Sequence, residues 1–185
     1  MNSKNSAVRL IVTLRWIDPP IWRRVVVPAG VSLAELHGIV QVVMGWENSH
    51  LHEWRVGRER YGVPDPGGVG FDDDLIDECT VRLLDVAPPG SQLEYAYDFG
   101  DSWEHEVVVE AALNPDDVGA VPTCEDGARA CPPEDIGGVP GYYELVQALR
   151  KPDSSEWGRE LAETLPAFDP EAFSVERVNQ LFRRS

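Results

Sequence analysis

Residues 93–109 read LEYAYDFGDSWEHEVVV, and this stretch decides the class of fold. Large side chains alternate with Glu and Ala on both sides of Gly100, as in two strands that each bury one face. A glycine suits a tight turn between them. The stretch therefore predicts a β-hairpin that turns around Gly100. Its inward-facing residues are expected to be Leu93, Tyr95, Tyr97, Phe99, Trp103, His105, Val107 and Val109.

Residues 8–27 predict a second hairpin. Apolar and polar side chains alternate from Val8 to Trp16, and a strand pattern resumes from Ile21 to Val27. Between them lies Asp18-Pro19-Pro20. Proline lacks the amide hydrogen of a strand ladder and restricts the preceding residue, so these three residues mark the turn.

An amphipathic helix is expected between the two hairpins. Ser32 and Glu35 form a capping box, in which each side chain can bond the other residue's backbone amide. Apolar residues follow at helical spacing, and Gly45 suits the helix end. Residues 50–56 and 80–86 are expected to be two further strands.

The remaining segments are expected to be irregular or helical. Residues 57–78 and 114–141 are rich in turn-forming residues or lack periodicity, whereas three short helices are expected near the C-terminus. These helices would span Tyr142–Arg150, Ser154–Leu165 and Ser174–Arg183.

This order of elements predicts an α+β fold. A largely antiparallel or mixed sheet would pack on the amphipathic helix as a β-grasp-like core, followed by a helical C-terminal extension. We expect one domain over residues 7–185. It would comprise a core at 8–112, an irregular loop at 113–141 and the extension at 142–184.

The composition of the 185-residue chain is typical of a globular protein, with 43% hydrophobic and 26% charged residues. No apolar run approaches the roughly 20 residues that cross a bilayer, and residues 1–6 lack the apolar core of a signal peptide. We therefore expect a cytoplasmic protein with no membrane partner. In that compartment Cys79, Cys124 and Cys131 would be reduced thiols.

The chain is acidic, with a formal net charge of −16 that divides into +3 for residues 1–60 and −19 for residues 61–185. Such a surface repels phosphate backbones, so generic nucleic-acid binding is disfavoured. A local basic face is the alternative, although some of its arginines could equally be solvated strand residues. Its members would be Arg15, Arg23, Arg24, Arg55, Arg58 and Arg60.

Four segments carry a resemblance to a known family. They are Pro19-Pro20-Ile21-Trp22-Arg23-Arg24, the stretch from Leu36-His37 through Gly45-Trp46 to His50-Leu51-His52-Glu53, the stretch Tyr97-Asp98-Phe99-Gly100-Asp101-Ser102-Trp103-Glu104-His105, and Cys131-Pro132-Pro133-Glu134-Asp135 with Gly137-Gly138 and Gly141-Tyr142. Their order and spacing resemble the plasmid pRiA4b ORF-3-like family over nearly the whole chain.

The resemblance implies an α+β domain of the MM3350-like fold, encoded by plasmids, mobile elements and bacterial chromosomes, with no established reaction. Some relatives carry an insertion-element passenger or putative recombinase label. A recombinase needs a nucleophile among several arginines, which the Arg23-Arg24 pair does not supply. Family members often have a further cysteine where this chain has Ile136, which argues against a cysteine-based metal site.

Three histidines are candidate metal ligands. His50 and His52 lie two residues apart on an expected strand, so both would project from one face. His105 follows the turn that contains Asp98 and Asp101. If the strands are adjacent, these groups could bind Zn²⁺ or Mn²⁺ and activate water. The alternative, favoured for His105, is a hydrogen-bonded core residue on an apolar face.

Four carboxylates are candidate catalytic groups. Asp98 and Asp101 could act as metal ligands or as an acid/base pair, or their side chains could bond backbone amides of the turn. Glu134 and Asp135 lie in a loop stiffened by prolines, and such loops often line sites.

The cysteines and the known cofactor motifs give little indication of a functional site. Cys124 and Cys131 lie further apart than the ligand pairs of a zinc knuckle, which favours lone thiols or a loop-packing role. Cys131 could act as a catalytic thiol with a distant histidine, but no residues near it in the sequence indicate a lowered thiol pKa. The chain contains no GxGxxG, P-loop or GxSxG motif, so no organic cofactor is expected.

These observations lead to three functional hypotheses. The first is a non-catalytic binding or accessory module that recognises a protein or small ligand through the 98–105 turn and the 131–142 loop. The second is a metal-dependent hydrolase that uses the three histidines with one of the two aspartates. DNA transaction is the third and requires the basic face. The first two depend on the segment around residue 50 meeting the Gly100 hairpin beside the proline-rich loop.

Overall fold

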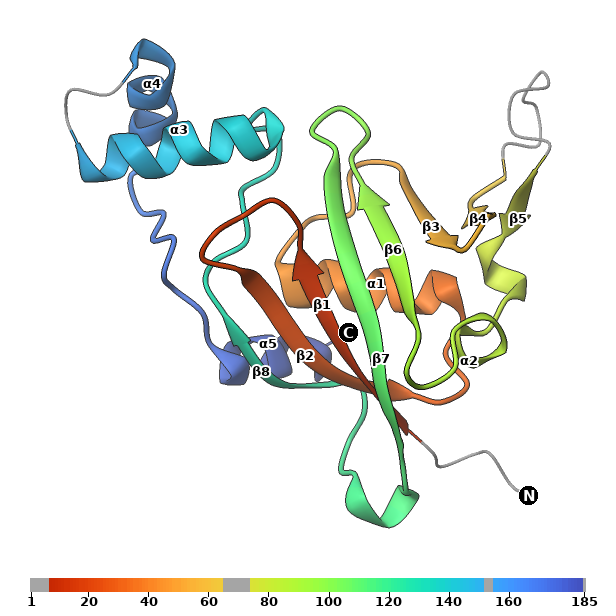
Figure 1. Ribbon diagram of the computed structural model, residues 1–185. Helices are drawn as coiled ribbons and strands as arrows, with labels where there is room; N and C mark the ends of the chain where they lie inside the picture. Colours follow the sequence, from red (N-terminus) through yellow and green to blue (C-terminus); the bar gives the residue numbers. More distant parts are fainter. Residues whose placement is uncertain (1–6, 65–73, 152–154, 185) are drawn as a thin grey trace.

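A computed structural model describes residues 7–64, 74–151 and 155–184 (Figure 1). The expected features of residues 1–6, part of the expected loop (65–73) and the expected helix start at Ser154 lie outside them. In chain order the strands are β1 (Ala7–Leu14), β2 (Ile21–Pro28), β3 (His52–Val56), β4 (Glu59–Gly62), β5 (Leu75–Asp77), β6 (Gln92–Tyr97), β7 (Trp103–Leu113) and β8 (Thr123–Ala128). The α-helices are α1 (Leu33–Met44), α2 (Leu83–Val86), α3 (Gly138–Arg150), α4 (Glu156–Thr164) and α5 (Val175–Phe182).

Within the described ranges the strands form one eight-stranded sheet in the order β5-β4-β3-β6-β7-β1-β2-β8. Every neighbouring pair is antiparallel except β4 and β5, which are parallel. Both predicted hairpins, β1–β2 and β6–β7, are confirmed. The predicted α+β class, with a mixed sheet, is therefore confirmed.

Helix α1 covers one face of the sheet, behind β1, β7 and β6 in Figure 1. The predicted capping box is present, since the Ser32 hydroxyl accepts from Glu35 N at 3.2 Å and the Glu35 carboxylate accepts from Ser32 N at 2.8 Å. Gly45 ends the helix in the left-handed conformation, with φ 89°. Leu36 and Val40 are fully buried against the sheet, so this face holds the core.

The C-terminal helices are close to their predicted positions. Helices α3 and α4 pack against each other, and α5 packs on β8 at one edge of the sheet (Figure 1). Tyr142 of α3 and Val178 of α5 join the main hydrophobic core. Across the described residues, each helix is too short or too polar to cross a bilayer.

Three sequence predictions about local structure are wrong. Residues 80–86 form the end of a 3₁₀ helix (Glu78–Thr80) and the short α2, because the Asp77 carboxylate caps the amide of Cys79 and starts a helical turn. The expected loop 57–78 contains β4 and β5. The expected irregular stretch 113–141 contains β8, an edge strand that pairs with β2. Its own sequence does not alternate, so periodicity gives no sign of a strand there.

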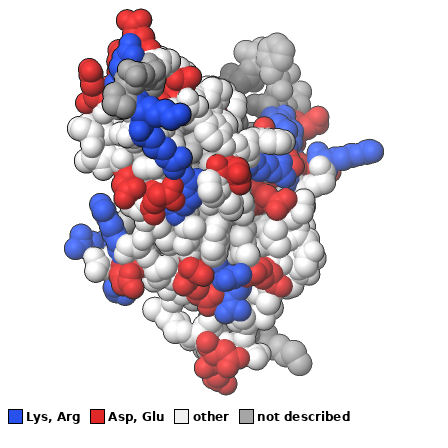
Figure 2. Space-filling model, turned by 60° about the vertical axis from the view of Figure 1, so that its left-hand side comes forward, with Lys and Arg blue, Asp and Glu red and all other residues white. Residues whose placement is uncertain are grey.

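The proposed basic face does not form. Arg23 is buried, and its guanidinium donates to four backbone carbonyls, those of Val43, Trp22, Ala128 and Arg129. Arg15 pairs with Glu94, Arg24 with Glu110, and both Arg55 and Arg60 with Glu53. On the side of the molecule shown in Figure 2, acidic and basic side chains are interspersed. Arg15, Arg24, Arg55 and Arg60 are thus paired with glutamates, and Arg23 lies inside the fold.

Candidate functional site

The pairing of β3 with β6 brings His50 beside Asp98. His52 lies opposite Tyr97 in the antiparallel ladder, and the amide of Asp98 donates to the carbonyl of Leu51 at 2.9 Å. His50 lies two residues before His52, just beyond this end of the ladder, and its Nε2 is 3.7 Å from Asp98 Oδ2. Adjacency of the residue-50 segment and the Gly100 hairpin, on which the functional hypotheses depend, is present.

The 98–102 turn fixes the Asp98 carboxylate. One oxygen, Oδ1, accepts from the amides of Gly100 at 2.9 Å and Asp101 at 3.3 Å, which is the turn role expected of an aspartate. The backbone of Asp98 is left-handed, with φ 54°. Its second oxygen, Oδ2, points toward His50, at 3.7 Å from Nε2. The side chain is only 8% exposed. The same carboxylate therefore shapes the turn and faces the imidazole.

The proline-rich loop is anchored on the other side of His50. Trp46, just after α1, donates its indole N–H to the carbonyl of Pro132 at 3.0 Å. The Glu134 carboxylate oxygen Oε1 accepts from the amide of Glu47 at 2.9 Å and from the Tyr97 hydroxyl at 3.0 Å. Burial raises the pKa of this hydroxyl, so it remains protonated and donates. The second oxygen of Glu134, Oε2, lies 3.4 Å from the same hydroxyl and faces His50 at 3.6 Å.

The loop also docks directly on the Gly100 turn. The amide of Gly137 donates to Asp101 Oδ2 at 3.2 Å. Gly138 packs so closely on the turn that a Cβ there would lie 2.4 Å from the carbonyl oxygen of Asp101. Asp101 thus holds the loop in place and is not among the residues that face His50.

The result is a cluster of one imidazole and three carboxylates. His50 Nε2 lies 3.2 Å from Asp135 Oδ1, 3.6 Å from Glu134 Oε2 and 3.7 Å from Asp98 Oδ2. This nitrogen is buried and makes no hydrogen bond within the described structure. Ligand atoms of His50, Asp98 and Asp135 all lie within 4.8 Å of one another. A nitrogen and oxygens at this spacing suit a divalent cation such as Zn²⁺ or Mn²⁺.

The cluster is open on one side. The Asp135 side chain is 75% exposed, whereas Glu134 is 18% exposed and His50 27% exposed. Glu134 and Asp98 each use one oxygen for a structural hydrogen bond, which orients the other as outer partners orient metal ligands. A cation at this position would keep coordination positions facing solvent.

His52 belongs to a different environment, and the structure does not bring it to the His50 cluster. Its ring stacks on His37 of α1 with centroids 3.5 Å apart, and its Nε2 faces both carboxylate oxygens of the buried Glu78 at 2.9 and 3.0 Å. The physical reason is that β3 begins at His52. His50 precedes the strand and does not share its alternation.

His105 is a core residue, as favoured from the sequence. It is completely buried between the rings of Trp46 and Tyr95, with both centroids 5.2 Å away, and its Nδ1 bonds the carbonyl oxygen of Tyr95 at 3.1 Å. Burial lowers its pKa to about 4. The expected joint metal site of His50, His52 and His105 is therefore not formed.

The cysteines do not contribute to the cluster in the described chain. Cys124 is buried, and its thiol donates to the carbonyl of Asp126 at 3.4 Å. Burial raises the pKa of both Cys124 and Cys131, which disfavours a nucleophilic thiolate. Cys124 lies on β8 within the main hydrophobic core, and Cys131 packs against that core, so both thiols have packing roles, Cys124 on a strand and not in the expected loop.

Two supporting residues were missed in the sequence. Tyr97, read only as an inward strand residue, holds Glu134 through its hydroxyl. His37 was not singled out, although it lies four residues before Gln41 on one side of α1, and both bond the Tyr95 hydroxyl. Two polar residues four positions apart in an otherwise apolar helix are the sequence pattern that indicates such a pair.

Comparisons with known proteins place the chain among relatives without an assigned activity. The family model of the plasmid pRiA4b ORF-3-like protein matches residues 6–177. Uncharacterized protein y4hQ of Sinorhizobium fredii (strain NBRC 101917 / NGR234) is 43% identical over 150 residues, which cover 80% of this chain and 75% of that protein. The crystal structure of a protein of unknown function, MM3350 from Methanosarcina mazei Go1, is similar with a TM-score of 0.80 and 32% identity, covering 93% of this chain and 97% of that one.

Proposed function

This chain belongs to the plasmid pRiA4b ORF-3-like family, and we propose that it is a non-catalytic binding module whose recognition site holds a divalent cation. The site lies between the 98–105 turn and the 131–142 loop. One observation carries the proposal: the buried, unbonded Nε2 of His50 is faced by oxygens of Asp98, Glu134 and Asp135.

Charge balance supports a cation. Three carboxylates gather around a single imidazole, and even a protonated imidazole neutralises only one of them. Repulsion among partly buried carboxylates costs free energy unless positive charge compensates it. A divalent cation bound to His50 Nε2 and the facing oxygens would provide the compensation. It would also link the turn and the loop, which are otherwise joined through Asp101, Glu134 and their partners.

A binding role fits the surroundings better than a catalytic one. The oxygens of Asp98 and Glu134 that do not face His50 accept hydrogen bonds from amides and a hydroxyl, and Asp101 is occupied by Gly137. Asp98, Glu134 and Asp101 are therefore held by structural hydrogen bonds, which makes these three carboxylates poor candidates for a general acid or base. The net charge of −16 further disfavours a nucleic-acid ligand.

Calorimetric titration of the purified chain, stripped of metal with a chelator, tests the proposal. We expect Zn²⁺ or Mn²⁺ to bind one site per chain, and His50→Ala to lower the affinity by about 100-fold or more, as loss of a direct ligand does. Asp116→Asn removes one acidic charge from an exposed residue outside the cluster and should leave the affinity unchanged. Equal binding by the parent and the His50→Ala chain would refute the site.

The hydrolase hypothesis remains a second candidate for one reason: the exposed Asp135 leaves the cluster open, so a bound cation could activate water. It would use His50, Asp98 and Asp135, not the three histidines first expected. Turnover of a p-nitrophenyl ester or phosphate by the metal-loaded chain, abolished in Asp135→Asn, would support the enzyme. Cation binding without such turnover would support the module.

A further inference from the structure

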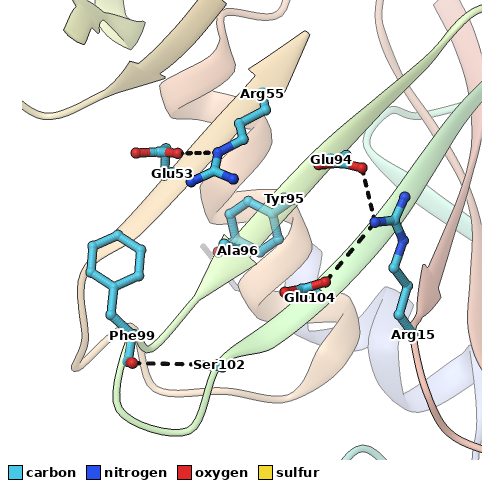
Figure 3. A pocket seen from close by; sticks show the side chains of 9 residues that line it. All are labelled: Arg15, Glu53, Arg55, Glu94, Tyr95, Ala96, Phe99, Ser102 and Glu104. Carbon is cyan, nitrogen blue, oxygen red and sulfur yellow. Dashed lines mark hydrogen bonds and ion pairs between the residues drawn. The ribbon is translucent and has the colours of Figure 1, made fainter. Parts of the chain in front are cut away.

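A pocket of about 370 Å³ lies on the face of the sheet opposite α1, beside the same 98–105 turn (Figure 3). Its floor is Ala96 of β6. In the ladder Ala96 lies between Glu53 of β3 and Glu104 of β7, so one methyl group stands in a row of longer side chains. The hollow exists because Ala96 is short, and its size is that of a ligand site.

The acidic groups of the pocket differ in how well they are neutralised. Glu53 is 5% exposed and accepts from the guanidinium groups of both Arg55 and Arg60. Glu94 accepts from Arg15 at 2.9 Å.

Glu104 has no comparable partner. Its closest arginine nitrogen, on Arg15, is 4.0 Å away, and its other contact is the neutral indole N–H of Trp16 at 3.3 Å. The side chain is 49% exposed. Glu104 is therefore the weakly compensated negative charge of the pocket.

An aromatic ring stands at the edge of the pocket. Phe99, expected from its alternation to face inward, is instead 56% exposed, because the left-handed backbone of Asp98 ends the strand before it. Figure 3 shows the ring beside the hollow over Ala96, with Glu104 across from it. The electron-rich face of an aromatic ring attracts organic cations, and a nearby carboxylate adds its own electrostatic attraction.

We propose that this pocket accepts the basic side chain, lysine or arginine, of an extended segment of a partner protein. The charged head would pair with Glu104, and the aliphatic stem would pack on Ala96 and Phe99. The net charge of −16 attracts basic segments over longer distances. The uncovered sheet face gives the partner's main chain room to pass. The inference rests on the proposed binding function and names the class of partner. Phe99 and Glu104 belong to the 98–105 turn of the proposed recognition site.

Matched peptides test the inference. Titration of the chain with Ac-Ala-Leu-Arg-Leu-Ala-NH2, followed by amide chemical shifts at low ionic strength, should show binding with shifts at Ala96, Phe99 and Glu104. The same peptide with citrulline in place of arginine keeps the shape and removes the charge, so its affinity should fall about fivefold or more. Equal affinity for the two peptides would overturn the proposal, as would free agmatine binding as tightly as the arginine peptide.

Variants assign the binding to this pocket. Glu104→Gln should lower the affinity for the arginine peptide about fivefold, and Phe99→Leu, which keeps an apolar contact without a π face, about threefold. Asp116→Asn, an equal change of charge elsewhere, should have no effect. Thermal unfolding of Glu104→Gln should match the parent because the side chain is half exposed. An unchanged affinity in Glu104→Gln contradicts the proposal.

A parallel titration separates the two proposals. If the peptide binds to a chain that takes up no Zn²⁺ or Mn²⁺, the cation site fails and the pocket stands. If the cation binds in a His50-dependent way and the peptide does not bind, the pocket fails and the cation site stands.

Discussion

Two histidines of this protein, His50 and His105, have the same unusual feature in opposite surroundings. Among the described residues, the Nε2 atoms of both are buried without a hydrogen-bond partner. Around His105 lie the rings of Trp46 and Tyr95, whereas His50 faces three carboxylates. An unbonded nitrogen therefore indicates a ligand site only where groups of complementary chemistry surround it. An apolar environment makes the same atom part of the core.

The largest expected effect is a loss of folding stability on substitution of His105, with no change in cation binding at His50. His105→Ala leaves a cavity in the core and should lower the free energy of unfolding by about 3 kcal/mol, measured by urea denaturation. His105→Phe keeps most of the volume and should lose less. Neither change should alter the affinity for Zn²⁺ or Mn²⁺. A fall in cation affinity in these variants would show that His105 and His50 are not independent.

The second prediction concerns pH. The folded-state pKa of His105 is about 4, below the ordinary value of about 6.5, because burial opposes its charged form. Between these values the unfolded chain binds a proton that the folded chain does not, so stability falls as the pH decreases. The contribution of His105 is complete above about pH 6.5, and roughly 3 kcal/mol is lost by about pH 4.

His105→Phe provides the control for this pH dependence. The variant should show a shallower decline of unfolding free energy between these pH values. Part of the decline should persist, because burial also lowers the pKa of His37. An identical pH profile in the variant and the parent would contradict the sealed environment assigned to His105.

The third prediction breaks the docking that creates the His50 cluster. Gly138→Ala introduces a Cβ 2.4 Å from the Asp101 carbonyl oxygen, on a backbone with φ 66°. It should destabilise the fold by about 2 kcal/mol and reduce cation affinity about tenfold by displacing Glu134 and Asp135. Gly57 has a similar φ of 62° with open space around it, so Gly57→Ala should cost only about 1 kcal/mol and leave cation binding intact. Equal effects of the two changes on cation binding would contradict this role of the docking.

The smallest effect concerns the hydroxyl that orients Glu134. Tyr97→Phe removes a donor to Glu134 and an acceptor for the amide of Ser49, and should cost about 1 kcal/mol of stability and about threefold in cation affinity. Tyr142→Phe is the matched control, because the buried Tyr142 hydroxyl makes no hydrogen bond in the described structure. A larger loss in Tyr142→Phe than in Tyr97→Phe would reverse the interpretation.

Much of the fold could be predicted because its elements are specified locally. The alternation around Gly100 and the capping box of Ser32 and Glu35 act within a few residues, and both are confirmed. Strand β8 could not be predicted, because the edge strand is held by its partner β2 and not by its own pattern. Phe99 was misplaced for a related reason, since the turn geometry of Asp98 overrides the alternation of the strand before it.

Periodicity and capping are properties of neighbouring residues, so the class of fold, the two hairpins, the capped helix and the acidic charge can all be predicted from the sequence. The sequence also indicates the three regions that meet at the candidate site. Which side chains face one another there depends on how distant segments pack together. His50 meets Glu134 and Asp135 across more than 80 positions of the chain because the proline-rich loop docks through Trp46, Glu47 and Asp101. Such long-range contacts leave no period in the sequence.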